Sequence, residues 1–214
     1  MTGAPPESAC PVVFTRYGDG ALLASIAHVV DERRDALLAY LKAHPGVADA
    51  YLTEQHALVI PTDAPFPTTH EGWWLDRATA GPSTCTLHTL SLRWDGADLP
   101  EAARLFSRSP EALAHAYMAP VYAVCFLGFR PGFAYLRGVP EGLRLPRRDQ
   151  VRARVPRNTF ALGGPYAGIY PCASPGGFWL LATATDVTLF EREGPRAGPL
   201  LRPGDRVRFV EAAR

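Results

Sequence analysis

Gly128-Phe129-Arg130-Pro131-Gly132-Phe133-Ala134-Tyr135-Leu136 combines turn-forming residues with aromatic rings and is the most informative part of the sequence. Two shorter stretches, Gly168-Ile169-Tyr170-Pro171 and Ser174-Pro175-Gly176-Gly177, have a similar composition. In each stretch a Gly or Pro bends the backbone next to an aromatic ring, so that rigid rings are held beside main chain that other groups can approach closely. A turn that only had to be polar would not need Phe or Tyr.

Short apolar runs precede these turns, at Val124 to Leu127, Thr159 to Leu162 and Ile169 to Tyr170. Short strands that alternate with Gly- and Pro-rich turns are typical of a barrel or a compressed sandwich. We therefore predict a barrel whose ring-bearing loops gather at one mouth, and that mouth is the candidate site.

The composition is that of an ordinary globular protein, with 214 residues, 47% hydrophobic and 20% charged. A formal net charge of +1 gives no electrostatic reason to expect nucleic acid or an anionic membrane as a partner. The four Cys include no C-x-x-C pair, and no run of eighteen apolar residues or signal-peptide pattern is present. We expect free thiols and a cytoplasmic protein.

Residues 1–82 read as a small α+β domain of ferredoxin-like type. Strands are expected on both sides of the Tyr17-Gly18-Asp19-Gly20 turn, and Leu37, Leu38 and Leu41 mark the apolar face of a helix from Asp31 to Ala43. Further strands are expected over residues 50–53 and 57–60, and a second helix near Thr69 to Ala78. Gly81-Pro82 closes the domain.

Residues 83–214 read as the barrel domain, with two short helices at its start. A strand is expected from Cys85 to Trp94, although its alternation leaves open which face is buried. Asp98 and Glu101 match a capping box for the first helix, and Pro110 stands at the first position of the second. Short strands follow after Gly138, up to Arg206 to Val210.

Six motifs in order carry a resemblance to a known family. They are GFRPGFAYL (128–136), PRR (146–148), RVP (154–156), GIYP (168–171), SPGG (174–177) and LLRPGDRVRFV (200–210). With them the chain resembles the B subunit of bacterial 5-oxoprolinase, the family also known as KipI-type kinase inhibitors or allophanate hydrolase subunit 1, a fold relative of the carboxyltransferase part of urea carboxylase. The resemblance implies a cyclophilin-like barrel for the second half.

Arginines and aromatic residues are the candidate site residues, because no G-x-G-x-x-G, Walker or H-E-x-x-H motif is present and the six His are dispersed. We therefore nominate no metal ligand. Arg147 and Arg154 could each grip a carboxylate or phosphate with a planar fork, or could belong to a solvated basic loop. For Arg148 and Arg152 the solvated loop is the better reading.

The rings of Phe129, Phe133, Tyr135 and Tyr170 could line a site or fill the barrel and staple its loops. The Tyr170 hydroxyl could donate a hydrogen bond to a ligand carbonyl. The remaining substrate-binding candidates are Tyr166, Ser174, Gly176 and Gly177. The two glycines would let a ligand approach the main chain, although the same Ser-Pro-Gly-Gly could be a tight turn only.

The resemblance implies an ATP-dependent hydrolase that opens the lactam of 5-oxoproline to glutamate. On this reading ATP is supplied by an A-type partner, this chain binds no cofactor itself, and a C-type partner of related barrel fold completes the pocket. Tyr170 and Arg154 would position the substrate and stabilise charge, and Arg147 would bind a carboxylate.

The chain departs from the family pattern mainly at polar positions. Tyr117 stands where the family has a His, Tyr166-Ala167 where it has Gln-Thr, and Ala182 to Thr185 lack an expected Arg-Thr-Pro. Because buried groups that lose a hydrogen-bond partner are costly, we expect a less polar ligand. Two alternatives therefore stay open: an inhibitor that docks on a sensor histidine kinase, and a stand-alone barrel enzyme acting on another substrate in a biosynthetic pathway.

Overall fold

The computed structural model describes residues 12–27, 29, 31–70 and 85–213. The chain divides into two compact units, Met1–Thr84 and Cys85–Arg214. The sequence places the domain boundary between residues 82 and 83, a stretch that lies outside the described residues.

The first unit is a four-stranded antiparallel sheet with a helix packed on it. The sheet has the order β2-β3-β5-β4, helix α1 packs on β4, and β1 pairs separately with β6. The described elements are β1 (Val12–Val13), β2 (Thr15–Tyr17), β3 (Ala21–Ser25), α1 (Asp31–Ala43), β4 (Val47–Leu52), β5 (His56–Pro61) and β6 (Thr69–His70).

Helix α1 has the bounds that its sequence pattern predicts, and Leu37 and Leu41 are buried in the core of this unit. The second helix, expected near Thr69 to Ala78, is wrong at its start, because Thr69–His70 forms strand β6 instead. The rest of that expected helix lies outside the described residues.

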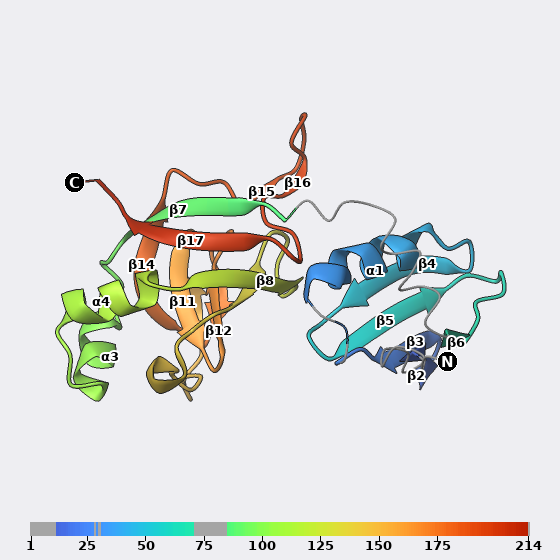
Figure 1. The fold of residues 1–214 in the computed structure, drawn as a ribbon, viewed down its shortest axis with the longest axis horizontal. Coiled ribbons are helices and arrows are strands. Elements are labelled where there is room, and N and C mark those ends of the chain that lie inside the picture. Colours follow the sequence, from blue (N-terminus) through green and yellow to red (C-terminus); the bar gives the residue numbers. More distant parts are fainter. Residues whose placement is uncertain (1–11, 28, 30, 71–84, 214) are drawn as a thin grey trace, which may run out of the picture. The chain divides into compact units, whose positions relative to one another are not determined.

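The second unit contains a closed seven-stranded barrel with the order β11-β12-β9-β8-β17-β7-β14. Its strands are β7 (Leu87–Arg93), β8 (Val121–Leu127), β9 (Ala134–Arg137), β11 (Thr159–Gly163), β12 (Tyr166–Ile169), β14 (Trp179–Thr185) and β17 (Arg206–Glu211). The last strand, β17, lies between β7, to which it is parallel, and β8, to which it is antiparallel (Figure 1). The α+β class and the barrel predicted from the sequence are thereby confirmed.

Helices α3 (Leu99–Leu105) and α4 (Pro110–Met118) lie near one end of the barrel (Figure 1). The remaining elements are the 3₁₀ turn η1 (Glu141–Leu143) and two separate antiparallel pairs, β10 (Arg152–Val155) with β13 (Ser174–Gly176) and β15 (Phe190–Glu191) with β16 (Gly198–Pro199). Helix α4 begins as predicted, since the Ser109 hydroxyl accepts a hydrogen bond from the Ala112 amide at 3.1 Å.

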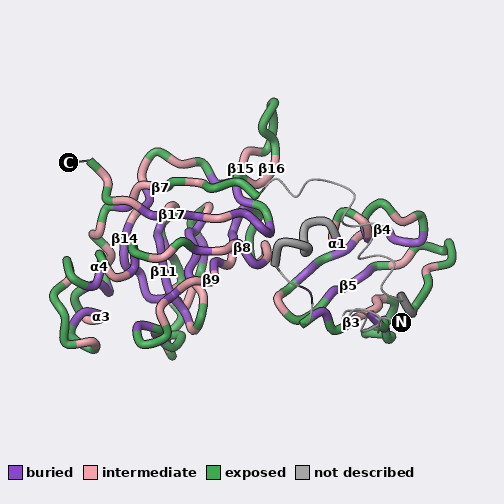
Figure 2. The backbone as a smooth tube through the Cα atoms, viewed as in Figure 1, coloured by how far each residue is buried: buried purple, intermediate pink, exposed green. Residues whose placement is uncertain are grey.

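The barrel wall has a different apolar cluster on each face. On β11, Phe160 and Leu162 join the large core, whereas Ala161 between them joins a second cluster with Phe133, Tyr170 and Phe178. Successive side chains of a strand point to opposite faces, so the second cluster lies across the wall from the large core. Every residue of β11 is therefore buried, and Figure 2 shows buried residues running along the barrel strands.

Candidate functional site

Seven aromatic rings among the described residues form a continuous group on the barrel unit, which we call the aromatic cluster. They are Phe126, Phe129, Phe133, Tyr135, Tyr166, Tyr170 and Phe178. Phe133 stands at its centre, with ring centroids 5.0 Å from Tyr135, 5.3 Å from Tyr170 and 5.4 Å from Phe129. Edge-to-face pairs at these distances are favourable, so the rings hold one another in place.

The rings of the cluster differ in solvent exposure, from a buried centre to an exposed edge. Phe133 is only 2% exposed, whereas Phe129 is 52% exposed and has a φ of +66°. A positive φ is uncommon for a bulky residue and costs conformational energy, so the surrounding turn must hold Phe129 in this position. Part of the cluster is therefore core, and Phe129 is its most exposed ring.

Glycines make room for the rings of the cluster. A Cβ on Gly168 would lie 2.6 Å from Phe133 Cζ, and one on Gly176 would lie 2.1 Å from the Tyr170 hydroxyl oxygen. Gly163 stands in the same relation to Phe178, whose ring carbons would lie 2.4 Å away. These separations are too short for any side chain, which explains why these three positions hold Gly.

Tyr170 and Tyr135 carry hydroxyl groups that remain protonated at neutral pH. Burial raises the pKa of Tyr170 above its usual value, with backbone hydrogen bonding from Phe178 acting in the opposite direction. Burial likewise raises the pKa of Tyr135, and the nearby Arg147 charge opposes it. Both phenols can therefore donate a hydrogen bond near a positive charge.

Arg147 brings that charge to the cluster, with its guanidinium carbon 5.3 Å from the centroid of the Phe178 ring. Its neighbours fix the chain on both sides: the Trp179 indole donates to the Pro146 carbonyl at 2.8 Å, and the Arg148 amide donates to the Gly177 carbonyl at 2.9 Å. Arg147 itself is exposed, and within the described segments no carboxylate forms an ion pair with it.

The other predicted residues have different surroundings. Ser174 is buried on β13, and its hydroxyl donates to the Cys172 carbonyl at 3.4 Å. The Gly177 carbonyl accepts the hydrogen bond from the Arg148 amide, and a Cβ on Gly177 would meet nothing closer than 3.5 Å. Arg154 is exposed on β10, beside the buried Val155, and no recorded contact among the described residues joins it to Tyr170.

Asp98 is the centre of an ion-pair network that the sequence pattern does not predict. Its carboxylate accepts hydrogen bonds from Arg152 Nη2 at 2.5 Å and from the Leu180 amide at 2.8 Å. Arg148 lies 3.4 Å from the same carboxylate and 3.0 Å from Glu101. The predicted capping box is therefore wrong, since both acids bind other partners, and Arg148 and Arg152 are paired rather than solvated. These contacts span 47 to 82 residues, so no local pattern signals them.

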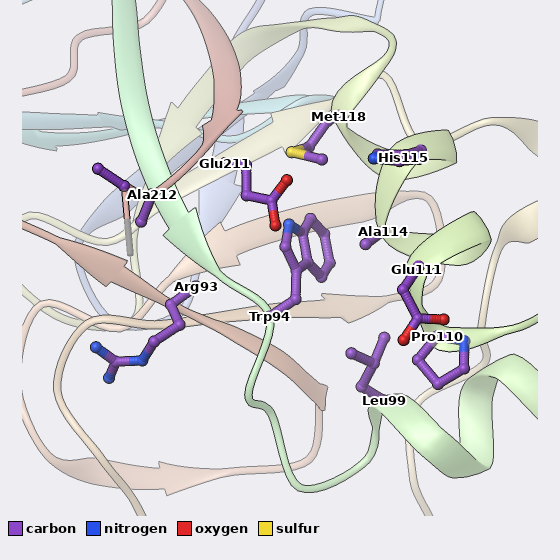
Figure 3. A pocket seen from close by; sticks show the side chains of 11 residues that line it. Arg93, Trp94, Leu99, Pro110, Glu111, Ala114, His115, Met118, Glu211 and Ala212 are labelled. Carbon is purple, nitrogen blue, oxygen red and sulfur yellow. The ribbon is translucent and has the colours of Figure 1, made fainter.

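A cavity of about 470 Å³ lies elsewhere on the barrel unit, between the ends of β7 and β17 and helix α4 (Figure 3). None of the predicted site residues lines it. Within the described ranges no group of three or more His, Cys, Asp or Glu is placed to hold a metal ion. None of the described helices combines the length and apolar character that a membrane span requires.

The fold is that of a barrel protein of the carboxyltransferase-like class. Residues 12–200 match the family described as carboxyltransferase domain, subdomain C and D, and the chain belongs to this family.

Similar curated proteins are named as the B subunit of 5-oxoprolinase. The one from Escherichia coli O157:H7 is 38% identical over 143 residues, which are 64% of this chain and 63% of that protein. The one from Haemophilus influenzae is 41% identical over 116 residues, 54% of this chain and 53% of that protein. The matched region thus spans less than two thirds of these relatives.

Solved structures agree with the fold. The crystal structure of TTHA0988 superimposes with a TM-score of 0.75 and 35% identity over 91% of this chain and 40% of that one. The urea amidolyase of K. lactis gives a TM-score of 0.60 at 14% identity, covering 94% of this chain and 15% of that chain. At that identity the likeness concerns the fold alone.

Proposed function

We propose that this chain is the B-type component of an ATP-dependent 5-oxoprolinase, which opens the lactam of 5-oxoproline to give glutamate. The names of the relatives, at 38% to 41% identity, support this reading. Those names describe one component of a larger enzyme, which supports a multi-subunit assembly. In it an A-type partner would bring ATP, and a C-type partner of related barrel fold would complete the pocket.

One observation on the chain itself carries the proposal: Arg147 lies over the Phe178 ring of the aromatic cluster, where its charge opposes the raised pKa of both Tyr135 and Tyr170. The substrate 5-oxoproline has a carboxylate, a lactam carbonyl and a small apolar ring. A guanidinium suits the carboxylate, a phenol O–H suits the carbonyl oxygen, and aromatic faces suit the ring.

Tyr170 is assigned to the lactam carbonyl. A lactam is a stable amide, so its opening requires charge on the carbonyl oxygen to be stabilised while water attacks. A hydrogen bond from the Tyr170 hydroxyl would polarise that oxygen, and Arg147 would hold the carboxylate. Arg154, which is exposed on β10, stays proposed for charge stabilisation.

The test is a coupled assay of the complete assembly. The chain is co-expressed with its A-type and C-type partners from the same genome, and ATP-dependent formation of glutamate from 5-oxoproline is measured. Because an ionic hydrogen bond is lost, Arg147→Gln should raise KM about 10- to 100-fold. The control is Arg157→Gln, which alters another exposed arginine of the same unit and should leave KM unchanged. Full activity without this chain, or an unchanged KM in Arg147→Gln, would contradict the proposal.

A less polar substrate is the second candidate, and Tyr166 is the observation that favours it. Tyr166 occupies the place where the family resemblance implies a polar Gln, and its ring lies edge-on to Tyr135 at 5.6 Å and to Phe126 at 5.7 Å. An aromatic surface there offers less hydrogen bonding to a ligand. Calorimetry with 5-oxoproline and with apolar cyclic amides decides between the two, since tighter binding of 5-oxoproline would rule this candidate out.

A further inference from the structure

The cavity of about 470 Å³ on the barrel unit is distinct from the aromatic cluster and shares no residue with it. Its volume lies in the range of about 300 to 1,000 Å³ that is usual for small-molecule sites. The lining comes from the ends of β7 and β17 and from helices α3 and α4. Strands and helices position a site more precisely than loops do, so this cavity is held by rigid elements.

Trp94 forms a fixed aromatic surface in the cavity. Its ring is stacked on Tyr117, with centroids 6.4 Å apart and planes 14° apart, and meets Phe160 edge-on at 5.8 Å. Both partners are fully buried, so the plane of the indole is set by the core. Leu99, Ala114 and Met118 add apolar surface around the indole (Figure 3).

Acidic groups stand around this apolar surface. Glu111 and Glu211 line the cavity, and both residues are exposed. The guanidinium of Arg93 lies 2.7 Å from the Asp95 carboxylate and points away from the indole ring in Figure 3. The charge of Arg93 is thus matched by Asp95, and the lining contains the carboxylates of Glu111 and Glu211 together with the imidazole of His115. A negative charge beside an aromatic face is the combination that binds organic cations.

The indole nitrogen of Trp94 gives independent evidence for a ligand site, because it lacks a hydrogen-bond acceptor in the described part of the chain. Trp94 Nε1 is buried and has no hydrogen-bond partner among the described residues. Figure 3 shows the Glu211 carboxylate on the same side of the indole as this nitrogen. A cation bound over the ring would draw the Glu211 carboxylate toward the indole. The carboxylate would then accept a hydrogen bond from Trp94 Nε1–H, and buried donors ordinarily have such a partner.

We propose that this cavity binds a small organic cation, namely an amine with a short apolar body. The ammonium group pairs with Glu211 and lies near Glu111, while the apolar body rests on Trp94 between Leu99 and Met118. This inference is independent of the proposed hydrolase function, because none of its residues belongs to the aromatic cluster.

Isoamylamine is the probe, and NMR on the full chain labelled with ¹⁵N is the measurement. The chain has 4 Trp, and the Nε1–H signal of Trp94 is assigned by its loss in Trp94→Phe. Isoamylamine should shift this signal in a saturable manner. Isovalerate and isoamyl alcohol have the same apolar body without the positive charge, and they should shift it much less.

Glu211→Gln should weaken the binding of isoamylamine about three- to fivefold, the range for one partly exposed ion pair. Glu193→Gln, which removes an exposed carboxylate outside the cavity, should leave the affinity unchanged. Native dispersion of the remaining signals shows that each variant is folded. Equal shifts with isovalerate, the absence of a saturable shift, or undiminished affinity in Glu211→Gln would each overturn the proposal.

Discussion

At the residue scale, close approach between glycines and rings determines the shape of the aromatic cluster. The Tyr170 hydroxyl occupies the space that a side chain on residue 176 would need, and Phe133 and Phe178 occupy the corresponding space at Gly168 and Gly163. Since interiors are packed as densely as organic crystals, none of these rings can retreat without disturbing others. Exact placement of the Tyr170 hydroxyl thus depends on the absence of one methyl group.

Gly176→Ala should displace the Tyr170 ring and lower the free energy of unfolding by about 1 to 3 kcal/mol, the usual cost of overpacking. Denaturant unfolding measures this loss. The matched control is Gly142→Ala, because a Cβ there would meet nothing within 4 Å. Equal stability of the two variants would show that the cluster tolerates the added methyl.

Buried phenols predict how stability depends on pH. Burial raises the pKa of Tyr117 and of Tyr122 well above the ordinary value of 10.0. A raised folded-state pKa means that the stabilisation is fully present below the unfolded value and is lost as pH rises beyond it. The free energy of unfolding should therefore fall once the pH exceeds about 10.

Tyr122→Phe should make that fall shallower, because the variant has one buried phenol fewer to ionise on unfolding. It also removes the hydrogen bond from Tyr122 to the Tyr117 carbonyl, at a cost of about 1 kcal/mol at neutral pH. Urea unfolding over a series of pH values measures both effects, with the exposed Tyr17→Phe as control. An alkaline slope identical to that of the unaltered chain would contradict the assignment.

At the scale of elements, Asp98 joins the start of α3 to two strands. One carboxylate binds the Leu180 amide of β14 and Arg152 of β10, and Arg148 approaches it from the loop before β10. Charges buried in this manner are favourable only while the set of partners is complete. The network therefore also steadies the segment that carries Arg147.

Asp98→Asn should lower the free energy of unfolding by about 3 to 5 kcal/mol, because Arg152 and Arg148 would lose their shared carboxylate. Asp95→Asn provides the comparison, since it breaks an exposed ion pair with Arg93 and should cost at most about 1 kcal/mol. Thermal and denaturant unfolding measure both variants. A loss for Asp98→Asn no greater than for Asp95→Asn would show that the network contributes little.

At the scale of the whole molecule, each of the two units has its own apolar core. Residues such as Leu41 and Val59 form the core of the first unit, whereas Leu136 and Phe209 belong to the large core of the barrel unit. The cores have no residue in common. Local stability can therefore differ between the units, as it does between cooperative parts of many proteins.

Leu41→Ala should destabilise the first unit by about 2 to 5 kcal/mol, and Leu136→Ala should destabilise the barrel unit by a similar amount. Hydrogen exchange of backbone amides, followed by unit, measures where protection is lost. Each substitution should lower protection in its own unit and leave the other nearly unchanged. Simultaneous loss in both units would mean that they unfold as one.

Local patterns were sufficient to predict part of the fold. The bounds of α1 and the start of α4 follow from apolar spacing and from a Ser-Pro cap, which are properties of neighbouring residues. The barrel follows from alternating strands and turns. Local rules failed at Asp98, because an acid before a helix has the same appearance whether it caps that helix or binds a strand 82 residues away.

The sequence predicted which aromatic residues of the candidate site lie together, but not on which face of the barrel wall they lie. Glycines and rings in the motifs indicated that Phe133, Tyr135 and Tyr170 lie together, which the ring distances show. Strand β11 is buried on both faces, so its sequence does not alternate between apolar and polar residues in a way that marks the inner face. The separation of the aromatic cluster from the large core was therefore not predictable from the sequence. The contact of Arg147 with Phe178 requires the loop geometry.

The position of β17 between β7 and β8 has a consequence for biosynthesis. A ribosome releases the chain from its N-terminal end, so β7 and β8 emerge long before Arg206–Glu211, the segment that must insert between them. Until translation reaches that segment the nascent barrel remains open, with unpaired strand edges on both sides of the gap. Closure of the barrel consequently waits for β17, and until then the edges of β7 and β8 can pair with other strands.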